Sequence, residues 1–184
     1  MNKLKFLSLS LKSLKTTGTV APSSRQLCHK MTRRIDGKKD IRVLELGAGN
    51  GVMTKAILKK MSPGSSLYAS EIHPEFCRQL REIEDKRLHV IEGSAEDIQS
   101  ALPTLHDVSE IDFIISSMPF VILPEDVFHS VLQACQNLLK PEGAFIQFHY
   151  SALEKRQYLP YFPHCKISFV PVNIPPAWVY VCTF

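Results

Sequence analysis

Hydrophobic residues follow two alternating patterns between residue 41 and the end of the chain. Short runs rich in β-branched residues, typical of buried strands, alternate with stretches in which apolar residues recur every three or four positions, typical of amphipathic helices. Strands are expected over 41–46, 66–71, 88–91, 111–116, 144–149, 166–170 and 177–182. Helices are expected over 52–61, 74–84, 95–101 and 125–139. This alternation predicts an α/β fold in which helices cover both faces of a mostly parallel sheet.

The last two expected strands follow one another without a helix between them. Pro171, Pro175 and Pro176 lie in the connection, which suits an antiparallel hairpin at the sheet edge. The sheet would then have seven strands. The length of 184 residues favours one domain of this kind over two.

A short helix is expected just ahead of the first strand. Ser23 or Ser24 can cap its start, and Asp36-Gly37 would end it. Its core face would consist of Leu27, Met31 and Ile35.

The first 16 residues form a different pattern, which divides the chain into a basic amphipathic helix over 1–16 and a main domain over 17–184. Leucines at three- and four-residue spacing fall on one helical face: Leu4, Leu7, Leu11 and Leu14. Lysines flank that face: Lys3, Lys5, Lys12 and Lys15. Such a helix can lie on an anionic membrane or pack against its own domain. The sequence leaves both interpretations open.

Charge separates the two parts of the chain as well. Residues 1–35 hold eight basic side chains and no acidic one, which leaves 14 basic and 18 acidic residues in 36–184. A basic arm ahead of a mildly acidic domain indicates an anionic partner, either a membrane surface or a nucleic acid. The five cysteines have no CxxC spacing and indicate reduced thiols in a cytosolic protein. The histidines make no metal-ligand spacing with them, so no metal is expected.

The strongest chemical signal is a glycine-rich loop between the first strand and the next helix. The strand runs directly into Gly47-Ala48-Gly49-Asn50-Gly51, and Glu71 follows at the end of the second strand. Glycines let the backbone approach a ligand closely, and a helix start offers free N–H groups. A carboxylate at the position of Glu71 can accept hydrogen bonds from both hydroxyls of a ribose. The order of strand, loop, helix and acid therefore predicts a nucleoside-binding site.

The segment 43–51 (VLELGAGNG) resembles motif I of class I S-adenosylmethionine-dependent methyltransferases, which have a Rossmann-like fold. In this family the loop surrounds the methionine part of the cofactor, and the acid matching Glu71 holds the ribose. The segment 92–97 (EGSAED) resembles the motif that contacts adenine, with Ser94 where many members have Asp. The resemblance implies S-adenosyl-L-methionine as cofactor. It places cofactor contacts at Glu45, Gly47, Ala48, Gly49, Gly51, Glu71, Ile72, Ser94, Ala95 and Ser116.

Two groups within this family are similar to the chain in different places. The segment 116–120 (SSMPF) resembles the Asn/Asp-x-Pro-aromatic motif of adenine N6 methyltransferases acting on RNA, with Ser117 in place of Asn. Bacterial phospholipid N-methyltransferases of the phosphatidylethanolamine type, and their ornithine-lipid relatives, are similar over nearly the whole chain. The marks of that similarity are the basic start, 18–24 (GTVAPSS), motif I, 145–150 (FIQFHY) and 173–180 (NIPPAWVY).

The lipid resemblance implies an enzyme that docks on the cytoplasmic face of a membrane and methylates a lipid headgroup amine. RNA adenine methylation is the alternative enzymatic interpretation. A cofactor-binding, membrane-associated adaptor without catalysis is the third, because Ser94 and Ser117 depart from the family patterns.

The expected catalytic residues follow the fourth and fifth strands. Tyr150 would position the amine as a hydrogen-bond acceptor, His149 would relay its proton, and Ser117 would hold it. Phe120 would stand with Tyr150 and His149 around the transferred methyl group. The alternatives are that His149 is a surface histidine, that Tyr150 serves packing, and that Ser117 is a turn residue.

Overall fold

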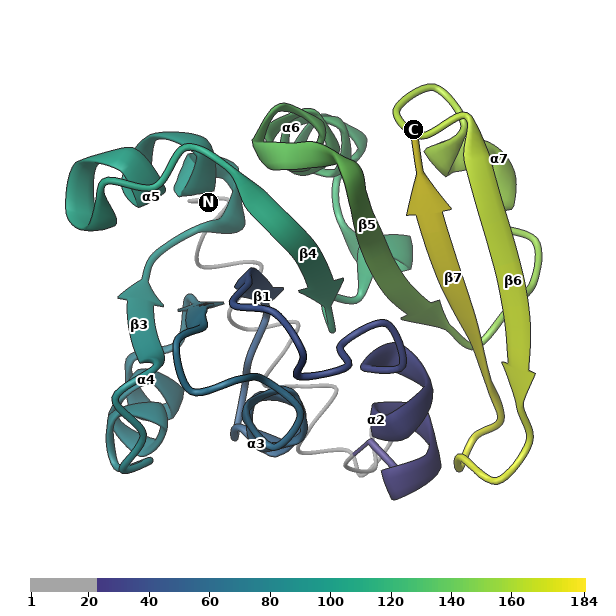
Figure 1. The fold of residues 1–184 in the computed structure, drawn as a ribbon. Helices are drawn as coiled ribbons and strands as arrows, with labels where there is room; N and C mark the ends of the chain where they lie inside the picture. Colours follow the sequence, from purple (N-terminus) through teal and green to yellow (C-terminus); the bar gives the residue numbers. More distant parts are fainter. Residues whose placement is uncertain (1–22) are drawn as a thin grey trace.

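The computed structural model describes residues 23–184, and these form one seven-stranded sheet with the order β3-β2-β1-β4-β5-β7-β6 (Figure 1). The strands are β1 Arg42–Leu46, β2 Ser66–Glu71, β3 Leu88–Glu92, β4 Ile111–Ser116, β5 Leu139–His149, β6 His164–Val170 and β7 Ala177–Thr183. Strands β1 to β5 pair in parallel, whereas β7 pairs antiparallel with both β5 and β6. The expected mostly parallel sheet with a C-terminal antiparallel hairpin is confirmed.

Helices cover both faces of this sheet. The helices are α2 Arg25–Met31, α3 Val52–Leu58, α4 Pro74–Arg81, α5 Ile98–His106, α6 Glu125–Leu138 and α7 Lys155–Tyr158, with 3-10 turns η1 Ala95–Asp97 and η2 Phe120–Ile122. Figure 1 shows α5, α6 and α7 on one side of the sheet and α2, α3 and α4 on the other. Each layer encloses its own apolar cluster, because successive side chains of a strand point to opposite faces.

Several expected boundaries were wrong. Helix α2 ends at Met31 and not at Asp36-Gly37, because Thr32 follows it as C-cap and its hydroxyl donates to the Cys28 carbonyl oxygen at 2.8 Å. The helix expected over 95–101 is a 3-10 turn followed by α5, which runs on through Pro103 to His106. A proline signals a helix end in sequence, yet a helix can accommodate one where packing outweighs the lost hydrogen bond. The helix expected over 1–16 lies outside the described residues.

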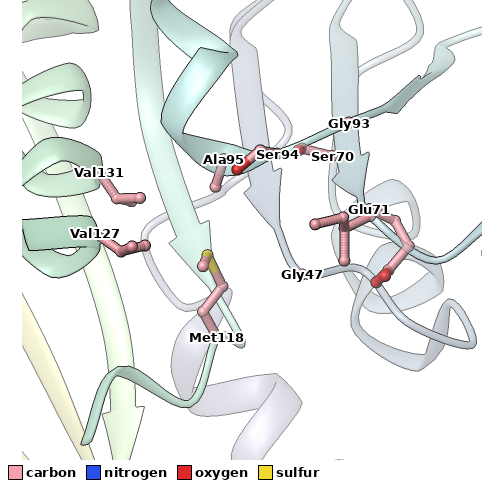
Figure 2. A pocket seen from close by; sticks show the side chains of 10 residues that line it. Gly47, Ser70, Glu71, Gly93, Ser94, Ala95, Met118, Val127 and Val131 are labelled. Carbon is pink, nitrogen blue, oxygen red and sulfur yellow. The ribbon is translucent and has the colours of Figure 1, made fainter. Parts of the chain in front are cut away.

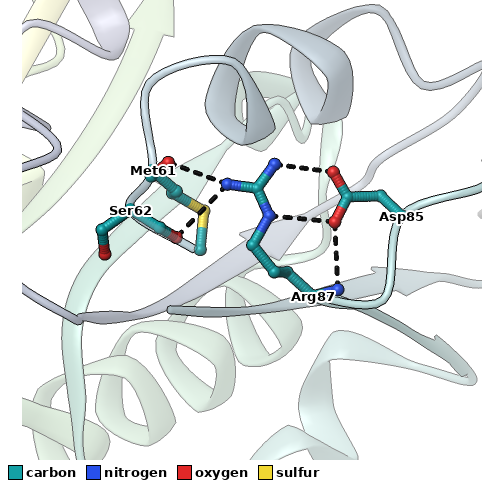
Figure 3. Close-up of polar contacts among 4 residues, drawn as sticks. All are labelled: Met61, Ser62, Asp85 and Arg87. Carbon is teal, nitrogen blue, oxygen red and sulfur yellow. Dashed lines mark hydrogen bonds and ion pairs between the residues drawn. The ribbon is translucent and has the colours of Figure 1, made fainter. Parts of the chain in front are cut away.

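A charged cluster joins two loops at the edge of the sheet where the parallel strands begin. Arg87 donates from Nε and Nη2 to the two carboxylate oxygens of Asp85, at 2.9 and 2.6 Å (Figure 3). Its Nη1 donates to the carbonyl oxygens of Met61 and Ser62. The hydrogen bonds from Arg87 lower the pKa of Asp85 to about 2. The ion pair and hydrogen bonds of Arg87 therefore connect the two loops at this edge of the sheet.

Candidate cofactor-binding and active site

The glycine loop lies at the edge of the sheet where the parallel strands end, which we call the carboxyl edge. Gly47, Gly49 and Gly51 have φ angles of +71°, +56° and +80°, a region that residues with a Cβ rarely adopt. The N–H groups of Gly47 and Ala48 both donate to the carbonyl oxygen of Ser70 in β2, at 2.9 and 3.2 Å. The loop is thus fastened to the neighbouring strand, and Gly51 caps the start of α3.

The carboxylate of Glu71 stands beside this loop. It is only 5% exposed, and its Oε2 accepts a hydrogen bond from the Gly49 N–H at 2.7 Å. Its Oε1 accepts from the His73 N–H at 2.9 Å. Each oxygen of a carboxylate has a second lone pair, so Glu71 can accept further hydrogen bonds from a ligand. The loop and the acid, 20 residues apart in sequence, are one structural unit.

A pocket opens between the glycine loop and helix α6, with a volume of about 410 Å³ including its open mouth. Its lining residues are Gly47, Ser70, Glu71, Ile72, Gly93, Ser94, Ala95, Met118, Val127 and Val131. Figure 2 shows Gly47 and Glu71 on one wall, with Val127 and Val131 on the facing wall. One side is polar and the other apolar, as a ligand with both a ribose and a flat base requires.

Two glycines keep this pocket open. A Cβ at Gly47 would stand 3.1 Å from the Cγ of Met118, which lines the pocket. Gly93 faces open space, where a Cβ would meet no atom within 4 Å. Together with the buried carboxylate of Glu71, this arrangement fits a nucleoside-type cofactor.

Half of the expected cofactor residues line the pocket: Gly47, Glu71, Ile72, Ser94 and Ala95. Ala48, Gly49 and Gly51 form the loop around it. Ser94 caps η1, since its Oγ accepts from the Glu96 N–H at 3.2 Å. Ser116 is fully buried, and its Oγ accepts from the Met118 N–H at 3.3 Å, so it braces the pocket wall from below.

Glu45 is the unusual acid of the site. It is fully buried beneath the glycine loop, where its Oε2 accepts from the Thr54 hydroxyl at 2.7 Å and its Oε1 has no partner within residues 23–184. Burial raises its pKa to about 8, so the native protein holds Glu45 largely protonated at neutral pH.

Where β4 and β5 end, two further buried polar atoms have no partner in the part of the chain that the structure describes. They are the Oγ of Ser117 and the Oε1 of Gln147. The Nε2 of Gln147 donates to the carbonyl oxygens of Met118 and Phe148, at 2.9 and 2.6 Å, which fixes the orientation of its amide. Gln147 pairs in register with Ser116, directly before Ser117. Ser117 Oγ and Gln147 Oε1 are therefore two acceptors next to Met118 that no described residue pairs with.

Sequence reasoning missed Gln147 as a site residue. The available signal was a single amide within an otherwise apolar or aromatic run, FIQFH. Such a buried amide requires partners, and one of its atoms has none among the described residues.

The role expected for His149 is not supported by its position. His149 is 5% exposed and does not line the pocket; its Nε2 lies 2.6 Å from the Tyr158 hydroxyl, and its ring meets that of Tyr180 edge-on. Burial lowers its pKa to about 4, so the ring is neutral at physiological pH. His149 is therefore not a surface histidine, because the pairing of β5 with β7 encloses this side chain in an aromatic cluster, and its role as a proton relay stays a prediction.

Tyr150 and Phe120 do not converge with His149 on the pocket either. Tyr150 is 44% exposed, and its ring packs edge-on against Phe148, on the other face of β5 from His149. Phe120 is buried against Phe128 and other rings of the core. These three aromatic residues surround no common site, whereas Met118, Val127 and Val131 line the pocket.

The fold and this site define a class I methyltransferase. In agreement, residues 43–143 match the family model described as a methyltransferase domain. The chain belongs to this family and is an S-adenosylmethionine-dependent methyltransferase. No group of His, Cys, Asp and Glu side chains in the described part of the chain could hold a metal ion.

Two curated proteins are similar in sequence to this chain, one over nearly its whole length and one over somewhat more than half of it. An ornithine lipid N-methyltransferase from Singulisphaera acidiphila is 31% identical over 180 residues, covering 96% of this chain and 93% of the relative. A protein arginine N-methyltransferase from Arabidopsis thaliana is 35% identical over 112 residues, covering 58% of this chain but only 27% of the relative.

Among solved structures, human methyltransferase-like protein 13 in complex with SAH has the same fold. Its TM-score is 0.64 at 19% identity, and the match covers 86% of this chain and 80% of that one.

Proposed function

We propose that this enzyme transfers a methyl group from S-adenosylmethionine to the amine of a lipid headgroup at a membrane surface. The observation that carries the proposal is the similarity to an ornithine lipid N-methyltransferase over 96% of the chain. That match includes the pocket and the buried polar atoms behind it. A primary amine is shared by ornithine-type and phosphatidylethanolamine-type headgroups, and either class fits the chemistry.

On the cofactor side, Glu71 would accept hydrogen bonds from the ribose hydroxyls. The glycine loop would lie against the methionine part, and Ser94 and Ala95 would lie against adenine. S-adenosylmethionine supplies an activated methyl group on a positively charged sulfur when it is bound. The protein's part is to orient the acceptor and to remove water from it.

On the acceptor side, the amine must be neutral because an ammonium nitrogen has no lone pair. An alkylammonium has a pKa near about 10.4 in water, and an apolar environment lowers that value. Met118, Val127 and Val131 supply such an environment in the pocket. Ser117 and Gln147 lie next to Met118 and do not line the pocket themselves. Ser117 Oγ and Gln147 Oε1 are buried without a partner among the described residues, so they would accept the N–H groups of an amine that enters past the Met118 side chain.

The test is transfer of labelled methyl from S-adenosylmethionine to vesicles that contain phosphatidylethanolamine, ornithine lipid or neither. Structured RNA is offered in a parallel reaction, and the Glu71→Ala variant serves as the control without cofactor binding. We expect label in the lipid extract of one amine-containing vesicle. Label in RNA alone would overturn the proposal in favour of adenine methylation. Cofactor binding without transfer to any amine would favour a non-catalytic adaptor instead.

The described residues are compatible with a peripheral position on the membrane. No helix in the part of the chain that the structure describes is long and apolar enough to cross a bilayer.

A further inference from the structure

Exposed apolar side chains of the described residues are concentrated at the carboxyl edge. Ten large apolar residues of the described part are exposed, and seven of them lie at this edge, in the segments that follow β4 and β5, at the end of β6 and in the loop after it. These seven, here called the apolar rim, are Val121, Ile122, Tyr150, Leu153, Phe169, Val172 and Ile174. The most exposed are Leu153 at 85% and Ile174 at 78%. Single exposed apolar residues are ordinary, but a group of this size at one edge indicates a binding surface.

The sheet topology explains why these residues gather. One segment follows β4, one follows β5, and the third is the loop of the β6–β7 hairpin (Figure 1). His149 at the end of β5 pairs with Trp178, and Val170 pairs with Ala177, so the hairpin loop lies next to the end of β5. The pocket opens at this same edge, because Met118 follows β4 and lines it.

Charge is absent from the rim and returns around it. No Asp, Glu, Lys or Arg occurs in residues 113–124 or 167–184. Exposed charged side chains of both signs stand nearby: Arg25 in the first turn of α2, Lys155 and Arg156 in α7, and Glu125 and Asp126 in the first turn of α6. Glu154, which is partly buried, separates Leu153 from α7. The basic side chains of α2 and α7 can contact anionic headgroups while the apolar rim lies at the boundary between headgroups and acyl chains.

The basic arm of the chain joins the domain at this place. The N–H of Ser24, just before α2, donates to the Asn173 side-chain oxygen in the hairpin loop at 3.0 Å. Residues 1–22, which precede it, contain four lysines and no acidic residue. The chain therefore enters the fold beside the rim from a segment whose charges are all positive, which favours an anionic bilayer over a neutral protein surface as the occupant.

We propose that the apolar rim inserts into the boundary region of an anionic bilayer and holds the pocket mouth against the lipid headgroups. This inference rests on the proposed function, since a headgroup substrate is what would require the pocket to face the membrane.

The chain contains its own probe for this insertion. Trp178 is the only tryptophan, and its ring packs on that of Phe169 in the rim, with centroids 4.6 Å apart. Full-length protein is mixed with phosphatidylcholine vesicles, with or without phosphatidylglycerol, that carry brominated acyl chains. We expect quenching of Trp178 fluorescence and a blue shift with the anionic vesicles. Binding to the vesicles without quenching would overturn the insertion.

A matched pair of variants tests the position of the surface. Leu153→Ser changes the rim, whereas Leu105→Ser changes a leucine that is 61% exposed at the end of α5, at the opposite edge of the sheet. Both are surface changes and should leave the melting temperature unaltered. We expect about tenfold weaker partitioning for Leu153→Ser and no change for Leu105→Ser. Equal partitioning of the two variants would overturn the rim as the docking surface.

Failure of this inference can be told apart from failure of the proposed function. A water-soluble, short-chain amino lipid below its aggregation concentration is offered as substrate without any membrane. Leu153→Ser should then match wild type, while on vesicles it should transfer methyl about tenfold more slowly. If the wild type methylates no amine, the proposed function fails, and Trp178 quenching still decides whether the rim inserts. A rim covered by a second copy would give a dimer by sedimentation and no quenching, which overturns the inference.

Discussion

The two halves of the sheet build their parts of the site by different means. In the half formed by β1, β2 and β3, backbone geometry makes the site: three left-handed glycines, and a carboxylate that accepts backbone N–H groups. In the half formed by β4, β5 and β7, the proposed acceptor site consists of side chains. They are the Gln147 amide, which two carbonyl oxygens hold in place, and the Ser117 hydroxyl, which has no partner among the described residues. A backbone-built site suits a cofactor shared by many enzymes, and a side-chain-built site can be adapted to one acceptor.

The two halves also differ in the solvent exposure of their side chains. The half formed by β1, β2 and β3, here called the cofactor half, buries Glu71, which is 5% exposed. The half formed by β4, β5 and β7, here called the acceptor half after its proposed role, continues into loops that expose Leu153 at 85% and Ile174 at 78%. If the enzyme acts at a bilayer, this division lets the cofactor half remain in water while the acceptor half contacts lipid.

The largest effect is expected in the cofactor half, from Glu71→Ala. The variant loses an acceptor for both ribose hydroxyls, and hydrogen bonds to a charged group contribute about 1.5–3 kcal/mol each. We therefore expect binding of S-adenosylmethionine to weaken at least about 100-fold, measured by calorimetry. Glu110→Ala is the control, because Glu110 is exposed just before β4, at the opposite edge of the sheet from the pocket. If Glu71→Ala binds S-adenosylmethionine within twofold of the wild-type affinity, Glu71 does not hold the cofactor.

A smaller effect, confined to the acceptor half, is expected from Gln147→Leu. Removal of the amide acceptor should lower kcat/KM for the amine about 10- to 100-fold, while affinity for S-adenosylmethionine stays the same. Ser117→Ala should act in the same direction without disturbing the hydrogen bond to the Met118 carbonyl oxygen. Gln133→Leu, on the exposed face of α6, is the matched control. If Gln147→Leu also weakened binding of S-adenosylmethionine, the side chain would not act on the amine alone, and the proposed division of the site would be wrong.

An effect of a different kind, on stability and not on binding or catalysis, is expected from Glu45. Its pKa of about 8 in the native state exceeds the ordinary value of 4.5, so the native protein retains a proton that the unfolded chain has released. The free energy of unfolding should therefore fall as pH rises from about 5 to about 8, by no more than about 1.4 kcal/mol per pH unit. Glu45→Gln should flatten this slope in urea titrations, whereas Glu92→Gln should leave it unchanged. An unaltered slope in Glu45→Gln would assign the dependence to other groups.

Local sequence alone determined the strands, the glycine loop and Glu71. Glycines that can adopt a left-handed conformation, and apolar residues that recur every 2 or 3.6 positions, are recognised from neighbouring residues alone. They can therefore be predicted before any tertiary contact is known. The antiparallel pairing of β6 with β7 was likewise accessible, because two strands joined by a short connection without a helix pair in antiparallel fashion. The insertion of β7 between β5 and β6 was not accessible, because a hairpin can add to the sheet edge by either of its strands.

Only the tertiary structure decided what surrounds His149 and Gln147. The two residues lie on the same face of β5 as Phe145, and the sequence treats both as polar positions within one strand. The pairing of β5 with β7 brings Tyr180 over His149 and excludes water, which makes this histidine neutral. The approach of the segment after β4 gives Gln147 the Met118 carbonyl oxygen as a partner, and Gln147 Oε1 is left without one among the described residues. Burial and partners depend on residues distant in sequence, and those distances become short only when the sheet has formed.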